Sequence, residues 1–170
     1  VSGAMLYMNT ASASATEVLL GQKYVSNNGA TNALGTVIDN NVLVTVNDTA
    51  ANTNTGSAQT IAASRTVVTN VTTGETITLA VLESGANTGV FAGTFSVSSS
   101  TTTGTMIKGL EGQTIKVEYT TALGLTIKGL TSDSLNYVTV DATGPTISNT
   151  SPADDYASKS GSIVFQAEVT

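Results

Sequence analysis

The chain has 170 residues and a net charge of −6, and only 11% of its residues are charged and 5% aromatic. It contains no cysteine, histidine or tryptophan, which excludes disulfides, most zinc, copper and iron chemistry, and catalysis by a cysteine or histidine. Its six basic residues are scattered singly, so we expect no nucleic-acid partner. No apolar run approaches the ~18 residues of a membrane-spanning helix, so we expect no membrane insertion.

The low charge does not predict disorder, because 40% of the residues are hydrophobic and they alternate with polar ones at period 2. In place of charged residues, the chain is rich in Thr, Ser, Asn, Ala, Gly and Val. β-Branched side chains favour pleated sheets, and a weakly charged Thr/Ser/Asn surface is typical of extracellular arrays. We therefore expect an all-β, antiparallel β-sandwich, located at the cell surface.

The first third of the chain offers weaker strand signals. The apolar segment Val1–Met8 and the Ala/Ser-rich Ala11–Ala15 suit a terminal strand and a connector, which belongs either to this sheet or to a neighbouring subunit. Thr16–Val25 is predicted as a strand rather than a helix because of Gly21 and the following Tyr-Val pair. Further strands are expected at residues 34–38, 42–47 and 60–69.

The clearest strands lie in the middle of the chain. In Glu75–Leu82 and in Val90–Val97, apolar residues occupy every second position, as in half-buried strands. Gly85 and Gly89 between them predict a hairpin with a longer loop. After the polar run at residues 98–104, more strands are expected at residues 107–110, 114–119, 123–130 and 135–140.

This middle region resembles a repeat of very large prokaryotic cell-surface and S-layer-like proteins. The resemblance rests on Val42–Asn54, VLVTVNDTAANTN, then on a Thr-Gly-Glu-Thr turn and the phrase Gly-Ala-Asn-Thr-Gly-Val-Phe-Ala-Gly-Thr-Phe. It closes with Gly112–Tyr119, GQTIKVEY, and covers roughly Val42 to Asp141. The resemblance implies an immunoglobulin-like (Ig-like) structural domain of a surface assembly, without enzymatic activity.

The domain boundary is expected where Gly144 and Pro145 follow the strand predicted over residues 135–140 and break it. We predict a sandwich over residues 1–140, with 1–15 as its terminal strand and connector, a linker over 141–146, and a strand segment over 147–170. The phrase Gly-Pro-Thr-Ile, followed by Pro-Ala-Asp, is similar to the start of bacterial Ig-like repeats. The last 24 residues are too few to bury a core alone.

Two interpretations of that C-terminal segment remain open beside simple packing on the first domain. It is either the opening of a second Ig-like unit or a donor strand that completes the sheet of a neighbouring subunit. The donor-strand reading rests on alternation in the last predicted strand, residues 162–169. The side chains expected to contact the neighbour are Ile163, Phe165, Ala167 and Val169.

Carboxylates in turns are the only candidate metal ligands. Asp39, Asp48 and Asp141 lie at predicted turns or strand ends, where they would suit calcium, although turns also select Asp for its own backbone hydrogen bonds. No other cofactor is indicated. Asn47, Asn70 and Asn149 begin Asn-x-Ser/Thr sequons and are candidate N-glycosylation sites.

These observations favour a structural role. We expect a subunit of an S-layer, sheath or filament that forms homopolymers by edge-strand pairing or donor-strand exchange. The alternative is an adhesin or carbohydrate-binding module of a larger cell-surface protein, which would place its tyrosines on one exposed face. No residue is a candidate for catalysis.

Overall fold

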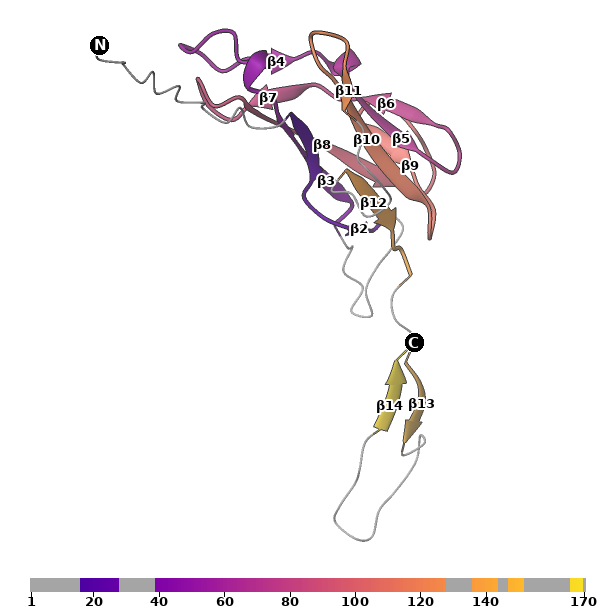
Figure 1. Cartoon of the computed structure of the whole chain (residues 1–170). Helices are drawn as coiled ribbons and strands as arrows, with labels where there is room; N and C mark the ends of the chain where they lie inside the picture. The colour runs from indigo at the N-terminus through magenta and orange to yellow at the C-terminus, as the bar shows by residue number, and fades with distance from the viewer. Residues whose placement is uncertain (1–15, 28–38, 128–135, 144–146, 152–165, 170) are drawn as a thin grey trace, which may run out of the picture.

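Two β-sheets packed face to face form a sandwich, which confirms the all-β fold predicted from the sequence (Figure 1). The computed structural model describes residues 16–27, 39–127, 136–143, 147–151 and 166–169. The expected strands at residues 1–8 and 34–38 lie outside these ranges. Two short 3-10 helices, η1 (Thr49–Ala51) and η2 (Ala63–Arg65), interrupt the strands.

The first sheet, here called sheet A, contains the longest strand of the described chain, β8 (Val90–Ser98). It runs in the order β1, β3, β8, β7, β4, with β9 paired in parallel to β8. Its other strands are β1 (Glu17–Leu20), β3 (Asn41–Asn47), β4 (Thr60–Ile61), β7 (Val81–Glu83) and β9 (Met106–Lys108).

The second sheet, sheet B, is built around β10 (Thr114–Thr120). Its order is β2, β12, β10, β5, β6, with the short β11 paired to the end of β10. These strands are β2 (Tyr24–Val25), β5 (Thr66–Asn70), β6 (Thr76–Thr78), β11 (Thr126–Ile127) and β12 (Tyr137–Val140).

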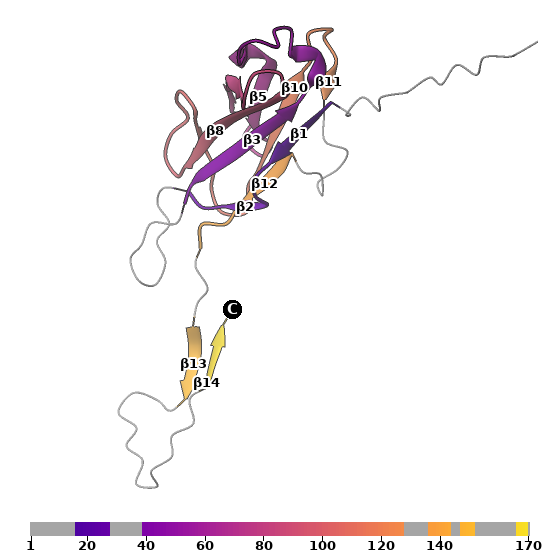
Figure 2. The ribbon, with the colours of Figure 1, turned by 90° about the vertical axis from the view of Figure 1, so that its left-hand side faces the viewer.

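The strand order is that of an Ig-like sandwich. The neighbours β1, β3, β8 and β7 correspond to the A, B, E and D strands of that fold, and β12, β10, β5 and β6 to G, F, C and C′. The first strand divides at Gly21: β1 pairs antiparallel with β3 in sheet A, and β2 pairs in parallel with β12 in sheet B. The two sheets are therefore joined by the chain itself at one edge (Figure 2).

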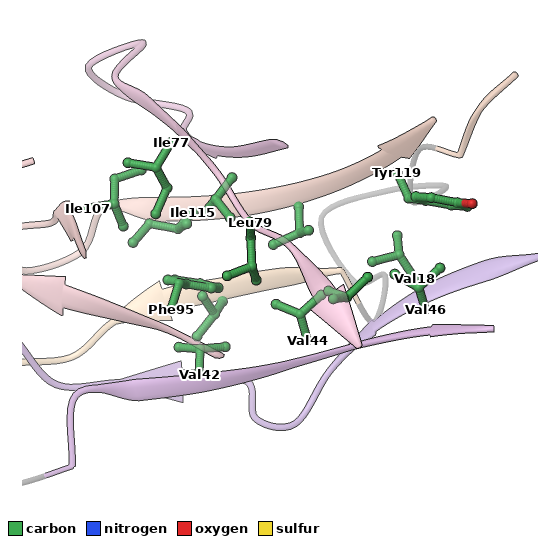
Figure 3. Close-up of a cluster of buried hydrophobic side chains, with 14 of the residues drawn as sticks. Val18, Val42, Val44, Val46, Ile77, Leu79, Phe95, Ile107, Ile115 and Tyr119 are labelled. Carbon is green, nitrogen blue, oxygen red and sulfur yellow. The ribbon is translucent and has the colours of Figure 1, made fainter. Parts of the chain in front are cut away.

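The core lies between the sheets, and period-2 alternation supplies it from both sides. Every second residue of β3 and of β10 is fully buried, and Figure 3 shows their side chains meeting across the interior. These residues are Val42, Val44 and Val46 from sheet A and Ile115, Val117 and Tyr119 from sheet B. The expected face of residues 90–97, with Phe91, Phe95 and Val97, is likewise buried.

The strand predicted over Glu75–Leu82 is in fact two strands in different sheets. β6 belongs to sheet B and β7 to sheet A, and the chain crosses the sandwich between them. Ile77, Leu79 and Val81 are all buried despite the crossing, because the segment keeps the same side turned to the core. The alternation was therefore correct about burial and wrong about continuity.

Glycine at position 93 makes room for this crossing. An added β-carbon there would lie 2.8 Å from the carbonyl oxygen of Ala80 and 3.0 Å from Val81 Cγ1. Gly109, where the chain passes from β9 to β10, is equally enclosed, since its β-carbon would lie 2.8 Å from both Val97 Cγ1 and Val140 Cγ2. The close approach of backbone and side chains at both crossings requires residues without a β-carbon.

Two other predicted strands are shorter than expected. The strand predicted over residues 60–69 is broken by η2 into β4 and β5, which lie in opposite sheets. The strand predicted over residues 123–130 is limited, within the described residues, to β11, because 121–125 form the turn that connects it to β10.

The C-terminal strands form a third sheet. β13 (Ile147–Ser151) pairs antiparallel with β14 (Gln166–Val169), with Ile147 opposite Val169 and Ser148 opposite Glu168. Neither strand belongs to sheet A or to sheet B. Within the described residues, this segment therefore adds no strand to either sheet of the sandwich.

Candidate interaction surfaces

The three candidate calcium ligands do not form one site. Asp39 is exposed and its Oδ1 accepts hydrogen bonds from the backbone and the side chain of Asn41. Asp141 is exposed at the end of β12, whereas Asp48 is buried at the end of β3. Within the described ranges, no three acidic side chains come together as a metal site requires.

Asp48 has a different role, as the centre of a buried polar network. Its Oδ1 accepts hydrogen bonds from the N–H groups of Ala50 and Ala51, at 3.0 and 3.3 Å, and so caps η1. Its Oδ2 accepts a 2.7 Å hydrogen bond from the Tyr119 hydroxyl, which comes from the opposite sheet. The carboxylate therefore ties the two sheets together at this end of the sandwich.

Arg65 completes the network from η2. Its Nη2 donates to the Tyr119 hydroxyl at 2.6 Å and its Nε to the carbonyl oxygen of Thr120 at 2.9 Å, while its guanidinium lies 5.2 Å from the Tyr119 ring centroid. Burial, together with the hydrogen bond to Asp48, raises the pKa of the Tyr119 phenol. The phenol therefore stays protonated and keeps donating to Asp48.

Glu83 organises the β7–β8 loop from a position that is only 3% exposed. Its carboxylate accepts hydrogen bonds from the N–H groups of Gly89, Thr88 and Gln59, at 2.9, 2.9 and 3.1 Å. The bond from Gly89, with those from Thr88 and Gln59, lowers the pKa of Glu83 below its ordinary 4.5, against the opposing effect of burial. An ionised carboxylate thus fixes this loop.

The candidate glycosylation sites differ in accessibility. Asn47 is half-buried and its amide donates to Glu17 Oε1 at 2.6 Å. Asn70 is fully buried, and its Nδ2 donates to the Lys108 carbonyl and to Gln113 Oε1, both at 2.9 Å. A glycan on Asn70 has no room in this fold, which corrects the expectation from its sequon. Asn149 lies in β13, where the backbone alone is described.

Of the four residues expected to contact a neighbour as a donor strand, Ile163 and Phe165 lie outside the described residues. Ala167 and Val169 lie in β14, and Val169 is opposite Ile147 of β13. The structure therefore places half of the predicted donor strand in a pair with β13.

Two tyrosines, the exposed Tyr24 and the half-buried Tyr137, lie on one surface. Tyr24, 56% exposed, is opposite Thr139 of β12. Tyr137 lies two residues before Thr139 on β12 and is opposite Lys116 of β10. Both rings therefore lie on the outer face of sheet B, and Lys23 Nζ is 6.0 Å from the Tyr24 ring centroid. Tyr119, by contrast, is buried, and Tyr7 and Tyr156 lie outside the described residues.

Sequence reasoning did not single out the exposed apolar residues at the two ends of the sandwich. Leu123 and Leu125, at the β10–β11 turn, are 87% and 63% exposed, and Val71 and Leu110, near the start of β10, are 52% and 44% exposed. Strand patterns identify apolar residues in turns poorly, because turns have no period to compare them with.

The chain matches no model of a known protein family, and no curated protein is significantly similar to it. Among the helices that the structure describes, none is long and apolar enough to cross a bilayer.

Proposed function

We propose that the chain is a structural module of an extracellular assembly, such as an S-layer, sheath or filament, which joins its neighbours by strand pairing. The proposal is supported by the Thr/Ser/Asn-rich composition, by the Ig-like sandwich and by the resemblance to repeats of prokaryotic cell-surface proteins. In such a module the function is mechanical, and hydrogen-bonded strands and a dense core resist unfolding.

The observation that carries the proposal is the two-stranded sheet of β13 and β14. A sheet of two strands is only marginally stable in water, and no other described strand pairs with it. The same antiparallel arrangement joins β1 to β3, the first pair of the sandwich. We infer that β13 and β14 begin a second Ig-like unit whose sheet is completed by strands of a neighbouring copy.

Electron microscopy of the purified chain at increasing concentration tests this function. The variant Glu168→Pro removes one backbone N–H from β14 and disfavours the strand, whereas Glu168→Ala at the same position keeps the N–H. Ordered polymers are expected from the unchanged chain and from Glu168→Ala, but not from Glu168→Pro at the same concentrations. Polymers formed equally by all three, or by none, would contradict the proposal.

A second candidate function, carbohydrate binding, is favoured by the two tyrosines on the outer face of sheet B. Their neighbours there include Thr139 and Lys116, which offer hydrogen bonds beside an exposed ring. The double variant Tyr24→Ala/Tyr137→Ala should then lose retention on immobilised polysaccharides, while Leu43→Ala on the outer face of sheet A should not. Equal retention of both variants would rule this function out.

A further inference from the structure

The chain leaves the sandwich at the end of β12, where one carboxylate binds the next two residues. Glu111 Oε2 accepts hydrogen bonds from the Ala142 N–H at 2.6 Å, from the Thr143 N–H at 2.9 Å and from the Thr143 hydroxyl at 3.1 Å. Because Glu111 lies 31 residues before Ala142 in sequence, these bonds depend on the fold and not on a local turn. Glu111, Ala142 and Thr143 are together called the exit latch below.

The carboxylate of the exit latch is carried by a preformed turn. The Gln113 N–H donates to the Leu110 carbonyl at 3.0 Å, and Gly112 between them has a φ of +74°, which favours glycine. Gln113 Oε1 accepts from the Leu110 N–H and from the amide of the fully buried Asn70, both at 2.9 Å. The backbone of Glu111 is therefore already in place, and closing the latch orders little more than its side chain.

The strand that leads to the exit latch is attached without help from Glu111. The Val140 N–H donates to the Gln113 carbonyl and the Asp141 N–H to the Val25 carbonyl, both at 2.8 Å. Backbone hydrogen bonds to other strands and turns of the sandwich thus extend to Asp141. The latch extends the attachment by two residues, to 143.

Ionisation strengthens the exit latch, and exposure lets it open. The hydrogen bond from the Ala142 N–H, with those from Thr143, lowers the pKa of Glu111 below its ordinary 4.5, against the opposing effect of burial. The carboxylate is therefore charged at neutral pH, and hydrogen bonds to a charged acceptor are stronger than those between neutral groups. Since Glu111 is exposed, water competes for the same oxygen, and the latch can open while the sandwich stays folded.

The exit latch lies on the path from the sandwich to the third sheet. β13 begins at Ile147, soon after Thr143, and shares no strand with sheet A or sheet B. Each residue has two soft backbone dihedrals, so opening the latch would free about four of them between Asp141 and β13. A closed latch removes this freedom.

We propose that Glu111 fixes where the chain leaves the sandwich and thereby limits the positions that the third sheet takes relative to it. Movement of the third sheet then starts after Thr143 when the latch is closed and after Asp141 when it is open. This conformational device belongs to the single chain, so it does not rest on the proposed assembly.

The test uses the full chain at pH 7 and at low concentration, with three variants. Glu111→Ala removes the carboxylate, whereas Glu111→Gln keeps one uncharged oxygen acceptor. Glu118→Ala is the control, since it also removes one negative charge, but from β10, where Glu118 lies 3.3 Å from Lys116 Nζ.

Amide hydrogen exchange, followed residue by residue by nuclear magnetic resonance, measures the latch itself. The amides of Ala142 and Thr143 should exchange about tenfold or more faster in Glu111→Ala than in the unchanged chain, and Glu111→Gln should lie between the two. The Asp141 amide, which donates to β2 and not to the latch, should keep its rate in every variant and so reports that β12 is intact. The control should change none of the three amides.

Spin labels measure the consequence for the third sheet. The chain has no cysteine, so cysteines introduced at the exposed Thr78 of β6 and at Ser148 of β13 carry the only two labels. The distribution of distances between them, measured by double electron–electron resonance, should be broader in Glu111→Ala than in the unchanged chain and in the control.

Three results would overturn the inference. Unchanged exchange of Ala142 and Thr143 in Glu111→Ala would show that the carboxylate does not hold them. Faster exchange with an unchanged distance distribution would show that the latch does not limit the third sheet. Loss of Asp141 protection in both Glu111 variants would show that Glu111 supports β12 itself. None of these results bears on polymer formation, so the inference and the proposed function can fail separately.

Discussion

Asp48 illustrates why a single residue's role depends on partners far away in the chain. Its position after a strand predicts either a turn carboxylate or a calcium ligand, and local sequence does not distinguish them. The Tyr119 hydroxyl that binds its Oδ2 is 71 residues away in sequence and in the other sheet. Only the sheet pairing brings them together, so this network could not be predicted from the residues around Asp48.

The variant Tyr119→Phe tests the worth of that contact. It removes the hydroxyl and leaves Oδ2 of a buried carboxylate without its described donor, which is expected to lower the free energy of unfolding by about 1–3 kcal/mol. Urea unfolding at pH 7 measures this change. Tyr24→Phe, which alters an exposed ring, should stay within about 0.5 kcal/mol. Equal effects of the two variants would show that the network adds no stability.

Glu83 makes stability depend on pH. Because its folded pKa lies below the ordinary 4.5, its contribution is fully present above that value and is lost as pH falls through the lowered pKa. The variant Glu83→Gln should therefore be less stable than the unchanged chain at pH 7, and this difference should shrink below pH 4.5. Urea unfolding at several pH values checks this, and a difference independent of pH would contradict it.

The point where the chain crosses from one sheet to the other could not be predicted from alternation. Alternation correctly predicted which residues of 75–82 are buried, yet a strand that leaves one sheet for the other keeps the same alternation. The signal that marks the crossing is Gly93, which lies in another strand. A lone glycine within a strand pattern indicates a close backbone approach, but it does not identify the segment that approaches.

The variant Gly93→Ala should destabilise the sandwich because its β-carbon would meet the Ala80 carbonyl, a backbone group that cannot move independently. We expect a loss of about 1–3 kcal/mol in the free energy of unfolding. Gly85→Ala is the matched control, since its β-carbon would meet only Thr88 Cγ2 at an ordinary 3.5 Å. If thermal and urea unfolding of the two variants agree, the crossing is not held by close packing at this glycine.

At the scale of the whole molecule, the sandwich and the third sheet share no strand. A chain ending at Thr143 should therefore unfold in urea with a free energy within about 0.5 kcal/mol of that of the full chain. A clearly less stable shortened chain would show that β13 and β14 support the sandwich directly.

The sequence could predict the all-β sandwich as a whole because enough strands alternate clearly, as in residues 90–97 and 114–119. It could not predict the apolar and aromatic residues of the surface. Leu123 and Val71 lie in turns, and Tyr24 and Tyr137 come from distant parts of the chain that sheet B brings together. Which side chains are exposed, and which of them lie side by side, depends on the order of the strands in the sheets. Local sequence patterns do not encode that order.

Amide hydrogen exchange in β13 and β14 tests most directly whether the module is completed by its neighbours. It should be measured on dilute protein and on the same protein in its assembled form. The account predicts rapid exchange at residues 147–151 and 166–169 in the dilute chain and strong protection after assembly, because the neighbour's strands then bond to them. Equal exchange in both states would contradict assembly through this sheet.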